Sequence, residues 1–284
     1  EYENALSLST SLKNNKIRSP KSQARVALPP IWILKPSTVN KGEGIRIVHC
    51  VEEVLDAVMD DSNIREWVLQ RYVNDPLLLN KKKFHIRAYV LAVSDITVYV
   101  YNEVLFLCSA VPYNPYDTSN LMSHITNTCY QQQKNKFDEA KYILTWKDFE
   151  KSILQDGTVS SEEEANKVSK QILENIFLIT RDLFAAYVGQ WSVFTPLKGC
   201  FEHYGFDFLV DEQFNVYLLE VNPGPDYKQT GQALSNYIIG GLMSETIDIA
   251  LRGVGCGNET QTQNRNNSSK MTMVFSCQLR GPNA

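Results

Sequence analysis

The sequence predicts an α+β fold with two α/β lobes, and two observations support this prediction. Residues 29–73 alternate between strand and helix patterns over short distances, so they are expected to form a small lobe. Residues 74–254 carry longer strand patterns, separate helices and a hairpin, so they are expected to form a larger lobe. The polar break Asn74-Asp-Pro76 between them is typical of a linker.

The small lobe is predicted from short segments of clear periodicity. Its strand segments are compact apolar runs or alternate between apolar and polar residues. Its helical segment has apolar residues at positions 51, 54, 55 and 58, which is the spacing of one helix face. The expected elements are strands at 31–34, 44–48 and 67–73 and a helix at 51–59.

The large lobe is predicted from strand-rich sequence followed by helices. Aromatic and β-branched residues fill two long runs around Ser94-Asp95, whereas residues 113–140 are polar and irregular. Apolar residues at helical spacing, such as Val168, Ile172 and Ile176, indicate a long helix facing a core. The expected elements are strands at 84–93 and 96–108, helices at 149–154, 165–187 and 242–251, and a hairpin at 205–222.

Both ends of the chain differ in composition from these lobes. Residues 1–28 are rich in Ser, Asn and Lys and are predicted to be a linker or the remnant of a preceding region. Residues 255–284 are predicted to be a polar, partly disordered tail in which residues 271–279 form a short terminal strand. Because the first residue is Glu, the sequence is expected to be a fragment or a processed chain, and the existence of an upstream targeting segment is left open.

Composition favours a cytoplasmic protein that binds neither nucleic acid nor membrane. The net charge is −4 and the isoelectric point is about 5.7, and no basic stripe or RNA-binding aromatic motif is present. No apolar run approaches the roughly 18 residues of a membrane span, and no secretory signal begins the sequence. The six cysteines are scattered without a CxxC pair, which favours a reducing compartment over a zinc site or disulfide framework.

Three oxygen-bearing side chains lie on the predicted hairpin. Glu220 and Asn222 are two positions apart, so they point to the same face of one strand. If Asp207 projects onto that face from the partner strand, three oxygen ligands converge. Mg²⁺ takes such ligands together with substrate phosphates. The alternative is a hairpin whose carboxylates are solvated on its outer face.

A short glycine loop follows the first strand. Lys35 ends that strand, and Lys41, Gly42 and Gly44 follow closely. Glycines let a backbone approach a polyphosphate and offer it N–H groups, and lysine supplies a mobile charge. Neither a Walker loop nor a dinucleotide fingerprint is present. The loop is therefore expected to contact phosphate, although a lysine at a strand end is also commonly solvated.

Residues at the end of the third strand are expected to line an adenine slot. Gln70, Arg71 and Tyr72 precede the linker between the lobes, where main-chain groups and apolar side chains can hold a base. The alternative is an ordinary strand end.

The next strand carries an alternating basic face. Lys83, His85 and Arg87 are two residues apart, so they share one face if the strand is extended. A basic face beside a carboxylate–magnesium site suits a triphosphate electrostatically.

These pieces together resemble the tubulin–tyrosine ligase-like family of the ATP-grasp superfamily. The resemblance covers about residues 28–252. The polar tail and the divergent motifs of this sequence are most similar to those of the fungal, processing-body-associated branch of the family. The motifs occur in the family's order: Trp32-Ile-Leu-Lys35-Pro36, Lys41-Gly-Glu-Gly44-Ile, Leu69-Gln-Arg-Tyr72, Lys83-Phe-His-Ile-Arg87, His124-Ile-Thr-Asn127 and Asp207…Glu220-Val-Asn222.

The resemblance implies an ATP-grasp fold with ATP between the lobes. Lys35 and Lys83 would hold the phosphates, and the loop at Lys41 to Gly44 would close over them. The strand end from Gln70 to Tyr72 would line the adenine slot.

The resemblance also implies roles near the reacting groups. Thr126 and Asn127 would lie near the ribose and phosphates, with His85 in the same nucleotide site. Arg87 would be the catalytic residue, facing the phosphate or the acceptor carboxylate. The implied magnesium ligands are Asp207, Glu220 and Asn222.

Family chemistry activates a carboxylate as an acyl phosphate with ATP, and the amine of an amino acid then attacks it. The enzyme contributes positioning and charge neutralisation more than covalent chemistry, as in other phosphoryl transfers.

Two departures from the family pattern bear on activity. Position 85 is His where the family usually has Asp, so a carboxylate is replaced by a titratable imidazole. In the strand around 101–109, the family's Gly and Arg align with Val104 and Leu107. Losing a charge clamp of this kind can reduce the rate by several orders of magnitude.

Two functional hypotheses follow. The first is an ATP-dependent carboxylate–amine ligase that modifies a protein or peptide acceptor such as a tubulin tail. The second is a weak or inactive ATP-binding scaffold whose partners, in the fungal branch, are mRNA-decapping proteins in processing bodies.

Overall fold

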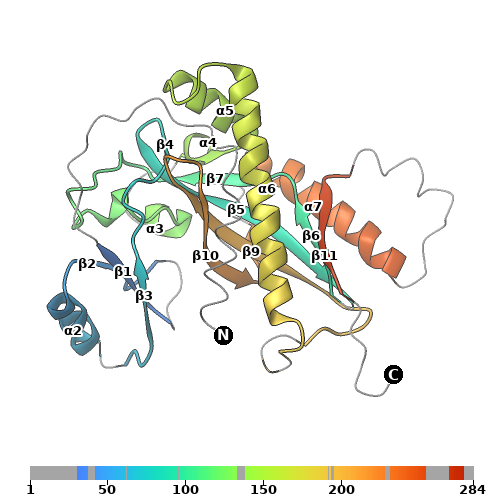
Figure 1. Cartoon of the computed structure of the whole chain (residues 1–284), viewed down its shortest axis with the longest axis horizontal. Coiled ribbons are helices and arrows are strands. Elements are labelled where there is room, and N and C mark those ends of the chain that lie inside the picture. Colours follow the sequence, from blue (N-terminus) through green and yellow to red (C-terminus); the bar gives the residue numbers. More distant parts are fainter. Residues whose placement is uncertain are drawn as a thin grey trace.

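The chain is described by a computed structural model that covers residues 31–37, 42–61, 63–94, 96–132, 138–190, 192, 195–227, 231–253 and 269–277. These residues form two separate β-sheets with helices packed against them (Figure 1). None of the helices in these ranges has the length and hydropathy of a membrane span.

The smaller sheet contains three antiparallel strands in the order β2-β1-β3. Its small core is formed by Leu34, Val48 and Ala57, with Val54 and Trp67 packed against them. The helix contributes Val54 and Ala57 to this core, whereas Val51, Leu55 and Val58, the other apolar residues of the predicted helix face, are exposed. The elements are β1 (Trp32–Pro36), β2 (Arg46–Val48), α2 (Val51–Asp60) and β3 (Trp67–Arg71).

The larger sheet follows the antiparallel order β10-β9-β5-β6-β11. Three shorter strands extend it, because β4 and β7 pair with β5, and β8 pairs with β7. The strands are β4 (Leu78–Leu79), β5 (Lys82–Val93), β6 (Thr97–Tyr101), β7 (Leu105–Cys108), β8 (Ile143–Leu144), β9 (Phe201–Val210), β10 (Val216–Pro223) and β11 (Met271–Ser276).

Helices cover both faces of the larger sheet. In Figure 1, α6 runs the length of one face beside α5, while α7 lies across the other side. Aromatic rings dominate the core under α5, where Phe106 and Phe149 stack with centroids 4.6 Å apart. The helical elements are η2 (Leu121–Ser123), α3 (Thr128–Gln132), α4 (Glu139–Tyr142), α5 (Trp146–Gln155), α6 (Glu162–Tyr187) and α7 (Gly231–Gly253).

The central strand β5 is buried on both faces, and its alternation positions the site. Its even-numbered residues from Phe84 to Ala92 belong to the core under α5 and α6. On the opposite face, Tyr89 and Leu91 pack with Ile238 of α7. The same face carries the buried polar residues in the first half of the strand, which are Lys83, His85 and Arg87.

The observed elements agree with most of the predicted ones. Strand 84–93, helix 165–187 and the hairpin correspond to β5, α6 and β9–β10, whereas α7 begins well before the predicted residue 242. A strand also lies within the segment where a terminal strand was expected, as β11. Residues 1–30 and 254–268 lie outside the described residues.

Two predictions of secondary structure were wrong. The single strand at 96–108 is split into β6 and β7, because Asn102 to Val104 interrupt it and shift its pairing with β5 by two residues. An even-numbered shift keeps each side chain on its face, so the apolar pattern did not reveal the break. The irregular stretch 113–140 contains η2 and α3, and the Asn127 side chain accepts from Cys129 N at the start of α3.

Candidate nucleotide and metal site

A cleft of about 810 Å³ lies between the two sheets and is lined by residues from both. The predicted site residues that line the cleft are Lys35, Gln70, Arg71, Tyr72, Lys83, His85, Thr126, Asn127, Asp207 and Glu220. Four other predicted site residues lie outside this lining: Gly42, Gly44, Arg87 and Asn222. Lys41 lies outside the described residues.

One part of the cleft is apolar and suits a flat heterocycle. Gln70 lies beside Ile33 in the β1–β3 pairing, and both line the cleft. Because β3 is an outer strand of its sheet, its outward main-chain groups have no strand partner in the part of the chain that is described. Sequence reasoning did not identify the opposite wall, which comes from apolar residues of α6, β9 and β10: Ile179, Leu209, Val216 and Leu218.

Two lysines place positive charge in the cleft. Lys83 is buried, and its Nζ donates to the Tyr72 hydroxyl at 2.8 Å. Burial and the charge of Lys35 lower the pKa of Lys83 to about 7. Burial also lowers the pKa of Lys35, although Glu220 and Asp207 oppose this effect. Two ammonium groups held close together in a cleft favour a polyanionic ligand.

The glycine loop requires both of its described glycines. Gly42 and Gly44 have φ values of +79° and +68°, which side-chain-bearing residues rarely adopt. A Cβ at Gly42 would lie 3.1 Å from Cγ2 of Ile125, and a Cβ at Gly44 would lie 3.0 Å from Cγ of Pro36. The loop therefore approaches the segment that carries Thr126, as closure over a bound phosphate would require.

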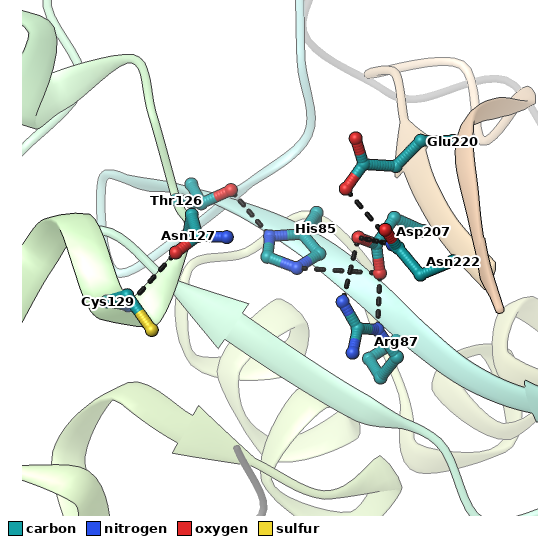
Figure 2. A network of polar contacts seen from close by, with 8 residues as sticks. All are labelled: His85, Arg87, Thr126, Asn127, Cys129, Asp207, Glu220 and Asn222. Atoms are coloured by element: carbon teal, nitrogen blue, oxygen red, sulfur yellow. Dashed lines mark hydrogen bonds and ion pairs between the residues drawn. The ribbon is translucent and has the colours of Figure 1, made fainter. Parts of the chain in front are cut away.

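The hairpin brings its three oxygen-bearing side chains together, as Figure 2 shows. Asp207 on β9 is the direct register partner of Glu220 on β10, next to a bulge after Leu218. The Asn222 amide nitrogen lies 3.1 Å from Glu220 Oε1 and 3.4 Å from Asp207 Oδ2. The three side chains therefore lie together as expected, but Asn222 turns its amide nitrogen rather than its oxygen toward the two carboxylates.

The chemistry of this donor set fits magnesium. Two carboxylates and one amide are hard oxygen donors, and Mg²⁺ usually takes one or two carboxylates together with phosphates and water. No group of three or more His, Cys, Asp or Glu side chains suited to a metal occurs within the described ranges. Two carboxylates and one amide would leave coordination positions that phosphates and water can fill.

Arg87 and Asp207 form a buried pair across β5 and β9. Arg87 donates from Nε to Oδ1 at 2.5 Å and from Nη2 to Oδ2 at 2.9 Å, in the bidentate geometry that guanidinium and carboxylate favour. Both residues are less than one-twentieth exposed. Gly205 makes room for this pair, because a Cβ there would lie 3.2 Å from Arg87 Nη1 and 3.0 Å from Pro225 Cβ.

The unusual His85 is buried between this pair and Thr126 (Figure 2). Its Nδ1 lies 2.6 Å from Thr126 Oγ1, and its Nε2 lies 3.8 Å from Asp207 Oδ1. Burial, together with the charges of Arg87 and Lys83, lowers the pKa of His85 to about 3. The imidazole is therefore neutral at physiological pH and cannot replace the charge of a carboxylate.

The second departure lies beside the first. Leu107 is the register partner of His85 in the β5–β7 pairing, and it is fully buried in the apolar cluster with Tyr89 and Leu105. Both departures thus affect the same corner of the site, where the family pattern would place the carboxylate of an Asp and the guanidinium of an Arg.

Replacing Gly205 with Ala should destabilise the protein and disturb Arg87. The added methyl meets two close neighbours, so the free energy of unfolding should fall by about 1–3 kcal/mol. Gly240→Ala is the matched control, because no atom lies within 4 Å of its Cβ position on α7, and alanine there should be neutral or stabilising. Urea denaturation measures both variants, and equal stability of the two would contradict the proposed crowding.

Comparisons with known proteins point to one family. A model of the tubulin-tyrosine ligase family matches residues 4–256. A probable tubulin–tyrosine ligase of Schizosaccharomyces pombe is 37% identical over 282 residues, covering 88% of this chain and 64% of that protein. The probable tubulin–tyrosine ligase PBY1 of Saccharomyces cerevisiae is 33% identical over 287 residues, covering 86% of this chain and 36% of that protein.

A solved structure agrees as well. The C-terminal domain of Pby1 from K. lactis, described as an ATP-grasp enzyme interacting with the mRNA decapping enzyme Dcp2, has a TM-score of 0.58 and 31% identity and covers 87% of this chain. This chain spans 63% of that domain, so it accounts for less than two thirds of each of these three relatives. The predicted α+β, ATP-grasp fold is confirmed, and the chain belongs to the tubulin-tyrosine ligase family.

Proposed function

We propose that the cleft binds Mg²⁺–ATP and that the domain uses it to join an amino acid to a protein or peptide carboxylate. The observation that carries this proposal is the meeting of three features in one cleft: an apolar slot, two lysines and the carboxylates of Asp207 and Glu220. Family membership supports the same chemistry.

The residues of this chain have distinct roles in the proposed reaction. Lys35 and Lys83 bind and orient the phosphates, and the loop at Gly42 and Gly44 excludes water above them. The residues that would hold the metal are Asp207, Glu220 and Asn222. When bound, Mg²⁺ would neutralise charge on the transferred phosphoryl group.

Arg87 has a narrower role than a free charge clamp. Its Nε and Nη2 are both committed to Asp207, so it fixes the orientation of one metal-binding carboxylate. Its remaining nitrogen, Nη1, lies over Gly205, and the residue is buried outside the cleft lining, so Arg87 acts through Asp207. Positioning of this kind contributes to catalysis through geometry.

A second candidate function is a scaffold that binds ATP but turns it over slowly or not at all. The buried, neutral His85 beside the apolar Leu107 favours it, because this corner lacks the charges of the family pattern. The solved Pby1 domain is described as interacting with a decapping enzyme, so the proposed partners are mRNA-decapping proteins in cytoplasmic processing bodies.

Magnesium–ATP should raise the melting temperature of the wild-type protein. A ligand at 100 times its dissociation constant adds about 2.7 kcal/mol to the free energy of unfolding. Glu220→Gln should lose most of the magnesium-dependent part of this gain, whereas Glu174→Gln, at an exposed position of α6, should keep it. Thermal denaturation with ATP, with and without Mg²⁺, tests this, and an unchanged melting temperature of the wild type at millimolar ATP would exclude the nucleotide site.

Above pH 7, the protein should take up a proton when it binds ATP. Free Lys83 has a pKa of about 7, and bound phosphate favours its charged form, so the pKa rises on binding. Between the two pKa values the complex holds more protons than the free protein, and affinity should fall up to tenfold per pH unit. Calorimetry at pH 8 in buffers of different ionisation enthalpy measures this uptake, which should largely disappear in Lys83→Gln. Equal uptake in that variant would assign the proton to another group.

Restoring the family residues should separate the two functions. If the corner is deficient, His85→Asp combined with Leu107→Arg should raise ADP release from a very low base, because the two positions are register partners. Leu107→Met is the control for repacking of the buried position. A wild-type rate in the ordinary enzyme range of roughly 1–10³ s⁻¹ would instead exclude the inactive scaffold.

A further inference from the structure

His124 is a buried residue that has no role in the proposed reaction as described above. It is 4% exposed and lies in the segment between η2 and α3. The rings of Tyr72 and Tyr113 contact it in edge-to-face geometry, with centroid distances of 5.8 Å and 5.3 Å. An imidazole held this tightly between two rings has a fixed orientation.

Both ring nitrogens of His124 have polar partners. Nδ1 lies 2.7 Å from the hydroxyl of Tyr72, and Nε2 lies 2.9 Å from the main-chain oxygen of Asp117. The Tyr72 hydroxyl in turn accepts from Nζ of Lys83 at 2.8 Å. A continuous chain of three hydrogen bonds thus leads from the phosphate-binding lysine to a loop of the larger lobe.

The direction of this chain follows from its end at Asp117. A carbonyl oxygen only accepts, so Nε2 of His124 must carry the proton. Burial lowers the pKa of His124, so the ring is neutral and Nδ1 is an acceptor. The Tyr72 hydroxyl therefore donates to Nδ1 and leaves its lone pairs for Lys83. Every donor in the chain points away from the lysine.

Further contacts hold the end of this hydrogen-bond chain at Asp117. The Asp117 side chain accepts from the hydroxyl of Ser119 at 2.7 Å and from Asn120 N at 3.3 Å, which closes a turn around the accepting carbonyl. The neighbouring Thr118 lies 3.1 Å from Nε2 of His49, next to α2 of the small lobe. The hydrogen-bond chain from the lysine therefore ends at a turn that is stabilised by its own hydrogen bonds and contacts both lobes.

We propose that His124 is a positioning residue for the nucleotide site: it fixes the hydroxyl of Tyr72 as an acceptor and thereby holds Nζ of Lys83 toward the ATP phosphates. This inference rests on the proposed ATP site. The ammonium group has three protons, and with one given to Tyr72 the other two remain for phosphate oxygens.

Two amide substitutions separate the halves of this role. The Oδ1 of Asn takes the place of Nδ1, so His124→Asn keeps an acceptor for Tyr72. The amide of Gln reaches the place of Nε2, so His124→Gln keeps the contact with Asp117 and loses the acceptor. Tyr72→Phe removes the hydroxyl and keeps the ring, so it tests the same link from the other side.

The test is to compare the binding of Mg²⁺–ATP and of adenosine to each variant, by competition with a fluorescent ATP analogue. His124→Gln and Tyr72→Phe should bind ATP about tenfold more weakly, which corresponds to one hydrogen bond to a charged group. Adenosine has no phosphate, so its affinity for His124→Gln should stay within about twofold of the wild-type value if only the lysine is misplaced. His124→Asn should recover most of the ATP affinity.

The outcomes are distinct. Unchanged ATP affinity in both His124→Gln and Tyr72→Phe would overturn the inference and leave the nucleotide site intact. Equal losses of ATP and adenosine affinity in His124→Gln would show a purely structural role for His124 and also overturn it. If the wild type binds neither ligand, the proposed function itself is wrong and the inference falls with it. Melting temperatures identify any variant that fails to fold, and the other variant then decides.

Discussion

The buried pair of Arg87 and Asp207 is the contact on which the rest of the site depends. It joins β5 to β9 at the point where the larger sheet meets the cleft, and it positions a carboxylate that can face the hairpin residues Glu220 and Asn222. Removing one partner of such a pair leaves an uncompensated charge in a site that excludes water, so both residues are constrained together. Gly205 is constrained as well, since the guanidinium passes over it.

The same strand explains why the cleft forms where it does. Along β5, one face changes from polar residues near Lys83 to apolar residues beyond Arg87, and α7 packs against the apolar half, at Tyr89 and Leu91. The polar half is left to face the small lobe. The opposite face is apolar from Phe84 to Ala92, so the strand stays anchored in the core while it carries charges toward the cleft. Sheet alternation thus accounts for both the support and the site.

The sequence predicted the chemistry of the site better than its shape. Period-two spacing was enough to bring Glu220 and Asn222 to one face, and motif order was enough to identify the fold. The apolar wall from Ile179 and Leu209 was missed, because apolar residues on a helix and a strand look alike whether they face a core or a ligand. The contact between His124 and Tyr72 could not be predicted either, since the two residues are 52 positions apart in the chain.

The outermost strand of the larger sheet comes from the far end of the chain. β11 pairs with β6 and covers its edge, and its start is bound to α7 through Glu245, which accepts from Lys270 N and Met271 N. Without it, β6 would present unpaired N–H and C=O groups beside Val98 and Val100. β11 therefore takes over the position of edge strand in the described part of the chain, and a shortened chain that ends after α7 would expose the edge of β6 even though every residue proposed to bind the nucleotide remained.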